Sequence, residues 1–192
     1  MRRRQVTIEL TLGETFRIEE GNEIGKRARD LYPNGVLVDE RSLISAVETT
    51  KDLINNPNIS EIFEGTFSVG NYVTKADILR RKSNEEWLMI EVKSSVNDKE
   101  EFIDDMAYTT MVIKQSGFSV SNTSIMLMSR DFRLGMENED LFIEIEHTDE
   151  VLQRVEELKV FMDEVDRSTR NENTPEAELC FGCKKCPLFK KC

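Results

Sequence analysis

Residues 73–95 read VTKADILRRKSNEEWLMIEVKSS and have the pattern of a β-hairpin. Two apolar runs, residues 72–81 and 87–94, flank the polar turn 83–85. This spacing favours two antiparallel strands joined by a short loop. If the middle residue of the turn is its centre, residues whose numbers sum to 168 lie opposite each other. Both strands are apolar enough to lie in the centre of a sheet, so we build the fold outward from this hairpin.

Three charged residues interrupt the apolar pattern of the hairpin. Asp77 lies in the first strand, and Glu91 and Lys93 lie in the second. In the register above, Asp77 is directly opposite Glu91. Opposed side chains on one face have Cβ atoms about 5 Å apart, so two carboxylates in these positions repel each other. A divalent cation between the two acids would turn that repulsion into attraction.

The second strand separates its charged residues from its apolar ones. Strand alternation puts Glu91 and Lys93 on one face and Leu88, Ile90 and Val92 on the other, toward the core. Carboxylate oxygens suit Mg²⁺ or Mn²⁺, and a lysine beside such an ion can orient water or stabilise charge on a phosphate. The combination predicts metal-dependent phosphodiester hydrolysis. The alternative is a set of solvated charges that form an ordinary surface salt bridge.

Length and composition describe one soluble globular domain. The chain has 192 residues, of which 39% are hydrophobic and 33% charged, and we expect a single domain over residues 1–192. No apolar run approaches the ~20 residues of a membrane span, and MRRRQVTIEL lacks the apolar region of a signal peptide. We therefore expect a cytoplasmic protein without membrane contact.

The net charge of −11 argues at first against a nucleic-acid partner. Its distribution weakens that objection, because residues 137–165 hold eleven acids against two bases. By contrast, residues 75–82 have a net charge of +3 and residues 180–192 a net charge of +4. We interpret the acidic segment as the solvated face of a helix and its lead-in, with a surface for a basic partner as the alternative.

Hydrophobic periodicity predicts the remaining elements of the chain. We expect helices at residues 19–31, 40–54, 98–115 and 148–166, and further strands at residues 5–10, 61–67, 123–129 and 141–146. Helices, an antiparallel hairpin, a crossover helix and another strand predict an α/β (α+β) fold, a mixed central sheet flanked by helices.

The spacing Asp77, thirteen residues, Glu91-Val92-Lys93 resembles the core of the PD-(D/E)XK nuclease superfamily, with Ala76 where the family name has proline. The wider frame of EIFEGTF, VTKADIL and WLMIEVKSS resembles the RecB-like nucleases, including the CRISPR-associated RecB-like exonucleases. The resemblance implies a restriction-endonuclease-like fold. It also implies that Asp77 and Glu91 bind the metal, that the carbonyl of Val92 adds a ligand, and that Lys93 assists the attacking water.

RecB-like nucleases usually contribute a further ligand from an N-terminal helix, often the His of a Gly-x-x-x-His pattern. Here Gly21 is in place, and Gly25 stands where the histidine would be. Glu23 is the better substitute, although it could instead pair with Arg27 one turn later. Glu64, in the strand before the hairpin, is a second candidate ligand, and its alternative is an edge charge that faces solvent.

Two further features depart from the family pattern. The one histidine, His147, lies far down the chain, where we expect a capping or surface role. In DDMAYTTMVI, Thr109 and Thr110 stand where relatives carry Gln and Tyr, which puts the family's substrate contacts in doubt.

All four cysteines lie in the last thirteen residues, CFGCKKCPLFKKC, which we expect to form a short metal-binding tail of the domain. Three cysteines at intervals of three before a proline are closer to runs that hold a 4Fe-4S cluster than to zinc knuckles. Cys183, Cys186 and Cys192 resemble the C-terminal triplet of the iron-sulfur RecB-like nucleases. Cys180 would have to supply the fourth ligand, and Zn²⁺ is the alternative.

Basic residues occur near both candidate sites. Arg80, Arg81 and Lys82 lie near the hairpin turn, and Lys184 and Lys185 lie between the cysteines. We interpret these five residues as candidate contacts to a nucleic-acid backbone.

The leading functional prediction is a Mg²⁺- or Mn²⁺-dependent DNA nuclease, a RecB-like exonuclease in repair, recombination or CRISPR and antiviral defence. Its partners would be single-stranded DNA or duplex ends, together with a helicase or a CRISPR or repair protein. The alternative is a catalytically weak or inactive protein of the same fold that binds nucleic acid or a nuclease or helicase partner. A zinc-stapled adaptor, in which the hairpin charges are incidental, is a third hypothesis.

Overall fold

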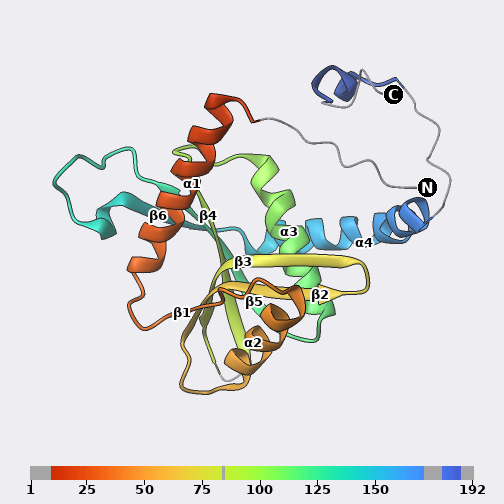
Figure 1. The fold of residues 1–192 in the computed structure, drawn as a ribbon, viewed down its shortest axis with the longest axis horizontal. Coiled ribbons are helices and arrows are strands. Elements are labelled where there is room, and N and C mark those ends of the chain that lie inside the picture. The colour runs from red at the N-terminus through yellow and green to blue at the C-terminus, as the bar shows by residue number, and fades with distance from the viewer. Residues whose placement is uncertain (1–9, 84, 171–178, 187–192) are drawn as a thin grey trace.

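The structure is a computed structural model, and it describes residues 10–83, 85–170 and 179–186. Its core is one sheet of six strands in the order β1-β2-β3-β4-β5-β6, with helices around it (Figure 1). The elements are α1 (Leu12–Asp30), β1 (Val36–Leu37), α2 (Leu43–Asn55), β2 (Glu61–Val69), β3 (Tyr72–Arg81), β4 (Glu86–Lys93), α3 (Glu100–Gln115), β5 (Ser119–Met128), η1 (Asn138–Leu141), β6 (Phe142–Glu146), α4 (Thr148–Arg170) and η2 (Phe181–Lys185).

The sheet is mixed. Strands β2, β3 and β4 form an antiparallel meander, β1 pairs with β2 in parallel, and β6 pairs with β5 antiparallel. Strand β5 is parallel to β4, so the chain must cross over between them, and α3 is that crossover. The predicted fold class, a mixed α/β sheet flanked by helices, is confirmed. None of the helices in the described ranges is both long and apolar enough to cross a membrane.

Helices cover both faces of the sheet. The larger core, which we call the α3-side core, joins the sheet to α2, α3 and α4. The smaller α1-side core lies on the opposite face and consists of Ala28, Phe63, Ile78, Leu88, Ile90 and Met126. Because β4 is buried on both faces, it reads as a nearly continuous apolar run.

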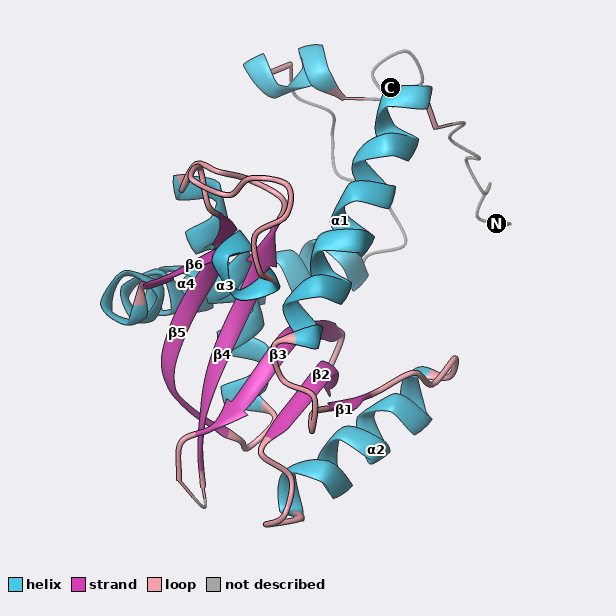
Figure 2. Cartoon of the chain, turned by 90° about the vertical axis from the view of Figure 1, so that its left-hand side faces the viewer, coloured by secondary structure: helices cyan, strands magenta, loops and turns pink. Residues whose placement is uncertain are grey.

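Helix α1 begins seven residues before its predicted start. Thr11 and Glu14 form a capping box, in which the Thr11 side chain accepts from the Glu14 N–H and the Glu14 carboxylate accepts from the Thr11 N–H. The buried residues Ile24 and Ala28 confirm the apolar side that the periodicity identified. The first turns have no such side, because they extend past the sheet (Figure 2) and leave Phe16 exposed.

The other elements match the prediction with shifted ends. The two-residue strand β1 escaped detection because two residues cannot show alternation. Helix α4 extends to Arg170, and β5 begins at Ser119 instead of residue 123. The predicted strand at residues 5–10 lies outside the described residues except for Leu10, which is not in a strand.

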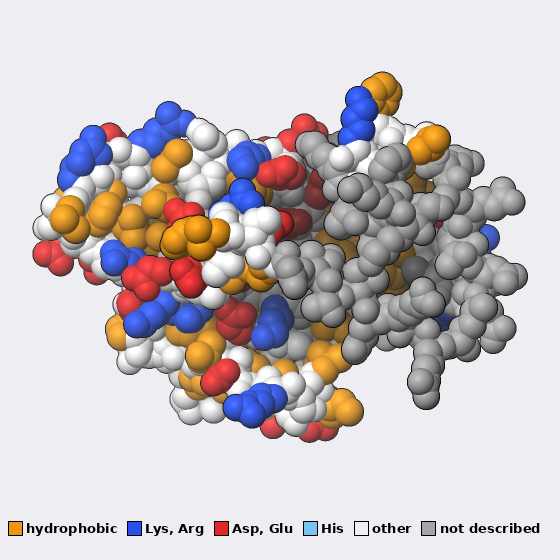
Figure 3. Space-filling view, turned by 45° about the horizontal axis from the view of Figure 1, so that its top comes forward, with side chains coloured by type: hydrophobic (Ala, Val, Ile, Leu, Met, Phe, Trp, Pro, Cys, Tyr) orange, Lys and Arg blue, Asp and Glu red, His pale blue; other side chains and the backbone are white. Residues whose placement is uncertain are grey.

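The acidic segment 137–165 is solvated, as predicted. Its described acidic side chains are exposed along η1, β6 and α4. On the face shown in Figure 3, acidic and basic side chains are interspersed instead of gathered by sign. Attraction for a polyanion on that face must therefore come from local groups of side chains.

Candidate active site

The register of the hairpin is the predicted one. Ile78 pairs with Ile90 and Arg81 with Trp87, so the paired residue numbers sum to 168. The main-chain pairing of β3 with β4 ends at Ile78 and Ile90, one residue before the acids, whereas β4 continues beside β5 as far as Lys93. The candidate site therefore lies where two central strands separate.

Asp77 is not presented to Glu91 as a simple ladder neighbour, which corrects the expected geometry. Its Oδ2 accepts the main-chain N–H of Val92 at 2.8 Å. This hydrogen bond replaces main-chain pairing beyond Ile78 and spans the gap between β3 and β4. It also fixes the carboxylate beside Val92, the residue whose carbonyl the resemblance names as a metal ligand.

Strand β2 changes face at Glu64. This residue has a φ of 55°, the left-handed region that non-glycine residues rarely adopt. Ile62 and Phe67 both belong to the α3-side core, although strict alternation would put residues five apart on opposite faces. The reversal leaves Glu64 on the α1 side next to Phe63, and there its Oε1 lies 3.4 Å from Nη1 of Arg29.

Strand β3 makes a matching change at Asp77. Ala76 and Leu79 are three residues apart and yet share the α3-side core, whereas Ile78 packs in the α1-side core. Neither Asp77 nor Glu64 is among the paired residues of β2 and β3, although the residues on either side of them are paired. The two irregularities together bring both carboxylates to the α1 side of the sheet.

A cavity of about 330 Å³ lies between α1 and this irregular part of the sheet. Its wall on the sheet side includes Glu64, Asp77, Ile78 and Val92. Its wall on the helix side consists of Gly21, Asn22, Gly25 and Arg29.

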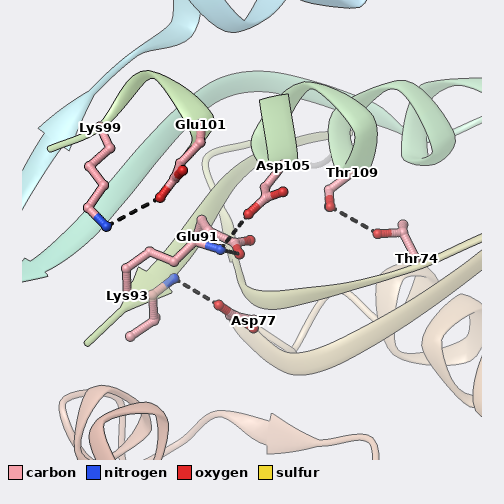
Figure 4. A network of polar contacts seen from close by, with 9 residues as sticks. Thr74, Asp77, Glu91, Lys93, Lys99, Glu101, Asp105 and Thr109 are labelled. Carbon is pink, nitrogen blue, oxygen red and sulfur yellow. Dashed lines mark hydrogen bonds and ion pairs between the residues drawn. The ribbon is translucent and has the colours of Figure 1, made fainter. Parts of the chain in front are cut away.

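Glu91 and Lys93 form an ion pair on the other side of β4, toward α3 (Figure 4). The Nζ of Lys93 lies 2.9 Å from Oε1 of Glu91 and 2.8 Å from Oδ2 of Asp105 on α3. It also lies 5.3 Å from the ring centroid of Phe102. The predicted neighbourhood of Glu91 and Lys93 is thus confirmed. Asp105 was missed, and its only signal is its place early in the helix that follows β4.

The surroundings shift the pKa values of all three charged residues. Burial, and then the charge of Glu91, raise the pKa of Asp77 to about 7, against the opposing effect of the Val92 N–H. Burial also raises the pKa of Glu91, although Lys93 opposes the shift. For Lys93, burial acts to lower the pKa, but the charges and hydrogen bonds of Glu91 and Asp105 outweigh it and raise the pKa.

These shifts bear on whether the site fits a metal ion. Among the described residues, no three carboxylate, imidazole or thiol groups are placed to hold one together. Mg²⁺ and Mn²⁺ need fewer, because such ions bind one or two carboxylates and keep several waters. Asp77 and Glu91 offer oxygen donors. Burial destabilises the anionic form of each, and the charge of Glu91 adds to this at Asp77, so the two acids fit a divalent cation.

The two candidate third ligands lie in different places. Glu64 borders the cavity together with Asp77. Glu23 is not among the lining residues; its side chain is 56% exposed and pairs with Arg27 at 2.8 Å, the alternative that the sequence left open. Gly25, at the position of the missing histidine, does face the cavity.

The candidate nucleic-acid contacts of the hairpin lie at its turn, whereas Asp77 lies in the middle of β3. The guanidinium of Arg81 donates from Nη2 to the carbonyl of Ile54, at the end of α2, and from Nε to the carbonyl of Ile59 in the loop that follows, both at 2.8 Å. It also stacks on Trp87, 4.2 Å from the ring centroid. Arg81 therefore serves the fold, because it satisfies carbonyls that the helix end leaves without partners.

Arg80 and Lys82 remain available as contacts. They border a groove on the α1 side of the sheet, and Arg80 has one long hydrogen bond, 3.5 Å, to the hydroxyl of Tyr32. Lys184 has its Nζ 5.5 Å from the ring centroid of Phe181. Lys185 ends η2, and its side chain is outside the description.

The described cysteines form a tight turn. The sulfur atoms of Cys180 and Cys183 are 3.7 Å apart, and the N–H of Cys180 donates to the Cys183 sulfur. Hydrogen bonds from the Cys183 side chain and from the main-chain N–H groups of Gly182 and Cys183 lower the pKa of Cys180. Cys180 and Cys186 are free thiols, and Cys192 lies outside the described residues.

His147 and the two threonines of α3 are structural. His147 Nε2 lies 2.7 Å from Asp98 Oδ2 and so connects the start of α4 to the segment before α3. Thr109 is buried and shares a hydrogen bond of 2.9 Å with Thr74 on β3. Thr110 is also buried, and neither threonine borders the cavity.

Comparison with known proteins gives little beyond the fold. No known protein family matches the chain, and no curated protein matches it by sequence. Seven chains of solved structures match it, and one is a crystal structure from Eubacterium rectale named "Putative exonuclease". That chain has 13% identity and a TM-score of 0.44, and the match covers 94% of this chain and 76% of that one. At this TM-score we rest no argument about activity on the likeness.

Proposed function

We propose that the protein is a divalent-metal-dependent DNA nuclease that hydrolyses phosphodiester bonds in the manner of the RecB-like exonucleases. One observation carries this proposal: two acids with raised pKa values, Asp77 and Glu91, lie where β3 and β4 separate, with Lys93 beside them. Acids whose anionic forms stay destabilised despite their structural partners are typical of functional sites.

Asp77, Glu91 and the carbonyl of Val92 are the groups that would hold Mg²⁺ or Mn²⁺. Asp77 and Val92 border the cavity together with Glu64, a candidate further ligand, whereas Glu91 lies toward α3 beside Lys93. A bound ion would supply Lewis-acid chemistry to a phosphate and lower the pKa of water. The hydrogen bond from Val92 N–H to Asp77 orients the first of these ligands before any ion arrives.

In this proposal Lys93 is protonated, and therefore a cation, at neutral pH. Because the neighbouring acids raise its pKa, it keeps three N–H donors on Nζ at neutral pH and cannot accept a proton from water. Its role is to orient the attacking water and to stabilise the charge that develops on the phosphate. Asp105 would keep Lys93 in place if Glu91 were a metal ligand.

The cysteine tail would hold a 4Fe-4S cluster through Cys180, Cys183, Cys186 and Cys192. The closeness of the Cys180 and Cys183 sulfurs supports a shared metal centre, because two thiols of this turn already converge. Zn²⁺ would use the same thiols. A brown colour with broad visible absorbance after anaerobic purification separates iron-sulfur from the colourless zinc form.

A second candidate function is binding without hydrolysis, to nucleic acid or to a nuclease or helicase partner. The glycine at position 25 and the lack of three converging ligands among the described residues favour it. For the nuclease, repair, recombination or defence against foreign DNA would be the setting, with DNA as substrate and the cytoplasm as compartment.

The deciding experiment is a Mn²⁺-dependent assay on end-labelled single-stranded and duplex DNA with anaerobically purified protein. Wild type is compared with Asp77→Ala, Glu91→Ala and Lys93→Ala. The control is Arg27→Gln, a substitution on the exposed side of α1, which is purified in the same way as the other variants. We expect hydrolysis that needs the metal and all three residues. Equal hydrolysis by the three variants would exclude the proposed site, and binding without hydrolysis by wild type would favour the second function.

A further inference from the structure

Helix α1 turns a face without side-chain bulk toward the carboxylates. Gly21, Gly25 and Arg29 follow one another at intervals of four, which puts them on one side of the helix, and all three border the cavity. Glycine inside a helix costs about 1 kcal/mol relative to alanine. A Cβ at Gly21 would meet no atom within 4 Å, and one at Gly25 only Nη1 of Arg29 at 3.7 Å. Close packing therefore does not require these glycines, and their effect is to keep the cavity open.

Two polar side chains on this wall have hydrogen-bonding capacity to spare. The Arg29 side chain is 26% exposed, and Nη1 reaches Glu64 at 3.4 Å, beyond the usual range for a good hydrogen bond. That is its one side-chain hydrogen bond within the described part of the chain, although a guanidinium carries five N–H donors. The Asn22 amide makes none to the described residues.

The charges of the cavity favour an exchange of partners. Glu64 and Asp77 face one cation, Arg29, across the cavity. A divalent cation bound by the acids would draw Glu64 away from Arg29, because its charge is higher and more compact. The freed guanidinium is a planar fork, which matches two oxygens of a phosphate.

We propose that the Gly21, Asn22, Gly25 and Arg29 face of α1 is a subsite for one nucleotide of a single nucleic-acid strand, with its phosphate on Arg29. The glycines leave room for the sugar, and the Asn22 amide can donate to a phosphate or sugar oxygen. This subsite rests on the proposed nuclease function and names the strand that the function would use.

The size of the cavity selects a single strand over a duplex. A volume of about 330 Å³ is at the lower end of the range for small-molecule sites, roughly 300–1,000 Å³. Interfaces with duplex DNA bury about 1,000–2,500 Å² of protein surface in open grooves. A duplex does not enter a cavity of this volume, so the carboxylates in its wall are reached by an unpaired nucleotide.

The test is binding of fluorescein-labelled dT15, measured by anisotropy in Ca²⁺, with a labelled duplex hairpin beside it. Arg29→Gln should weaken dT15 binding about tenfold or more and reduce the salt dependence by about 0.7 in log–log slope. Arg27→Gln, which removes an exposed arginine of the same helix, should change neither. Wild type should bind dT15 more tightly than the duplex DNA hairpin. Equal affinities of Arg29→Gln and Arg27→Gln, or tighter hairpin binding, would overturn the proposal.

A second variant protects the test against a simple folding defect. Gly25→Leu fills the cavity and should weaken dT15 binding as Arg29→Gln does, with no loss of thermal stability because leucine is the better helix former. Gly25→Ala should keep binding, since its Cβ has room. Electron paramagnetic resonance measures the Mn²⁺ affinity of Arg29→Gln. It should equal or exceed that of wild type, because Arg29 no longer competes with Mn²⁺ for Glu64. Weaker Mn²⁺ binding, or full dT15 binding by Gly25→Leu, would count against the subsite.

The two proposals fail in different ways. If wild type cleaves no DNA but binds dT15 through Arg29, the nuclease function fails and the subsite stands. If wild type cleaves DNA and Arg29→Gln shows the KM and kcat of Arg27→Gln, the nuclease function stands and the subsite fails.

Discussion

The two ends of the β3–β4 hairpin hold charged side chains in opposite electrostatic states. At the turn, Arg81 donates to several main-chain carbonyls and stacks on Trp87. At the open end, Asp77 receives one main-chain N–H, and burial together with Glu91 raises its pKa to about 7. The charge of Arg81 is balanced by contacts within the fold, whereas the charge of Asp77 has too few partners to balance its burial.

The number of partners of a buried charge distinguishes a structural residue from a functional one better than the residue type does. A buried charge with all its partners stabilises the chain around it, and removing it leaves those partners unsatisfied. A buried charge without enough partners costs stability, so it persists where a ligand can complete it. On this reasoning the open end of the hairpin is the functional end.

The largest expected effect is on activity at the open end. Asp77→Asn should lower metal-dependent hydrolysis at least about 10²–10³-fold, because the anionic ligand is lost while the Val92 N–H keeps an acceptor. Its free energy of unfolding at pH 8 without metal should be no lower than that of wild type. Single-turnover kinetics and urea denaturation measure the two quantities. A variant that loses activity and stability together would make Asp77 a structural residue.

The next effect is on stability at the turn. Arg81→Ala should lower the free energy of unfolding by about 3 kcal/mol, since carbonyls at the end of α2 lose their donor and Trp87 loses its cation. Activity per folded molecule should be unchanged. Arg80→Ala is the matched control, because within the described residues Arg80 contacts Tyr32 through one long hydrogen bond and a distant ring contact, and it should cost less than about 1 kcal/mol. Weaker DNA binding by a fully stable Arg81→Ala protein would restore Arg81 as a nucleic-acid contact.

Much of this arrangement could be predicted from the sequence. The register followed from the hairpin turn, because pairing arithmetic needs only a loop centre. The ion pair of Glu91 and Lys93 followed from strand alternation. The sheet with its crossover helix followed from periodicity, since both faces of β4 had to be covered.

The parts that escaped prediction depend on breaks in that regularity. No local pattern indicates the φ of 55° at Glu64 or the matching change at Asp77, because alternation is the assumption that they violate. Asp105 meets Lys93 only through the docking of α3 on the sheet. Arg81 looked like a surface base until the end of α2 was placed beside it.

The third effect is on the pH dependence of stability. The pKa of Asp77 is raised from its ordinary 3.8 to about 7, so the folded protein binds more protons than the unfolded chain between those values. Stability of the metal-free protein should therefore fall as pH rises from about 4 to 7, by at least about 2–4 °C in Tm relative to Asp77→Asn. Arg81 contributes nothing in this window because it stays charged.

Mg²⁺ should reverse that loss. Because the ion binds the deprotonated acids, the rise in Tm that it causes should be larger at pH 8 than at pH 5. Differential scanning calorimetry with and without Mg²⁺ measures it at both pH values. If the difference in Tm between wild type and Asp77→Asn does not change with pH, the carboxylate of Asp77 has as complete a set of partners as the guanidinium of Arg81.

The smallest effect compares two acids near α1. Glu64→Gln should weaken Mn²⁺ binding about tenfold, because Glu64 shares the cavity with Asp77. Glu23→Gln should leave Mn²⁺ binding unchanged and alter stability by no more than about 0.5 kcal/mol, because Glu23 is exposed and paired with Arg27. Isothermal titration gives both affinities. A larger loss of Mn²⁺ affinity in Glu23→Gln than in Glu64→Gln would mean that α1 supplies the further ligand from its exposed side. The metal site would then lie outside the cavity between α1 and the sheet.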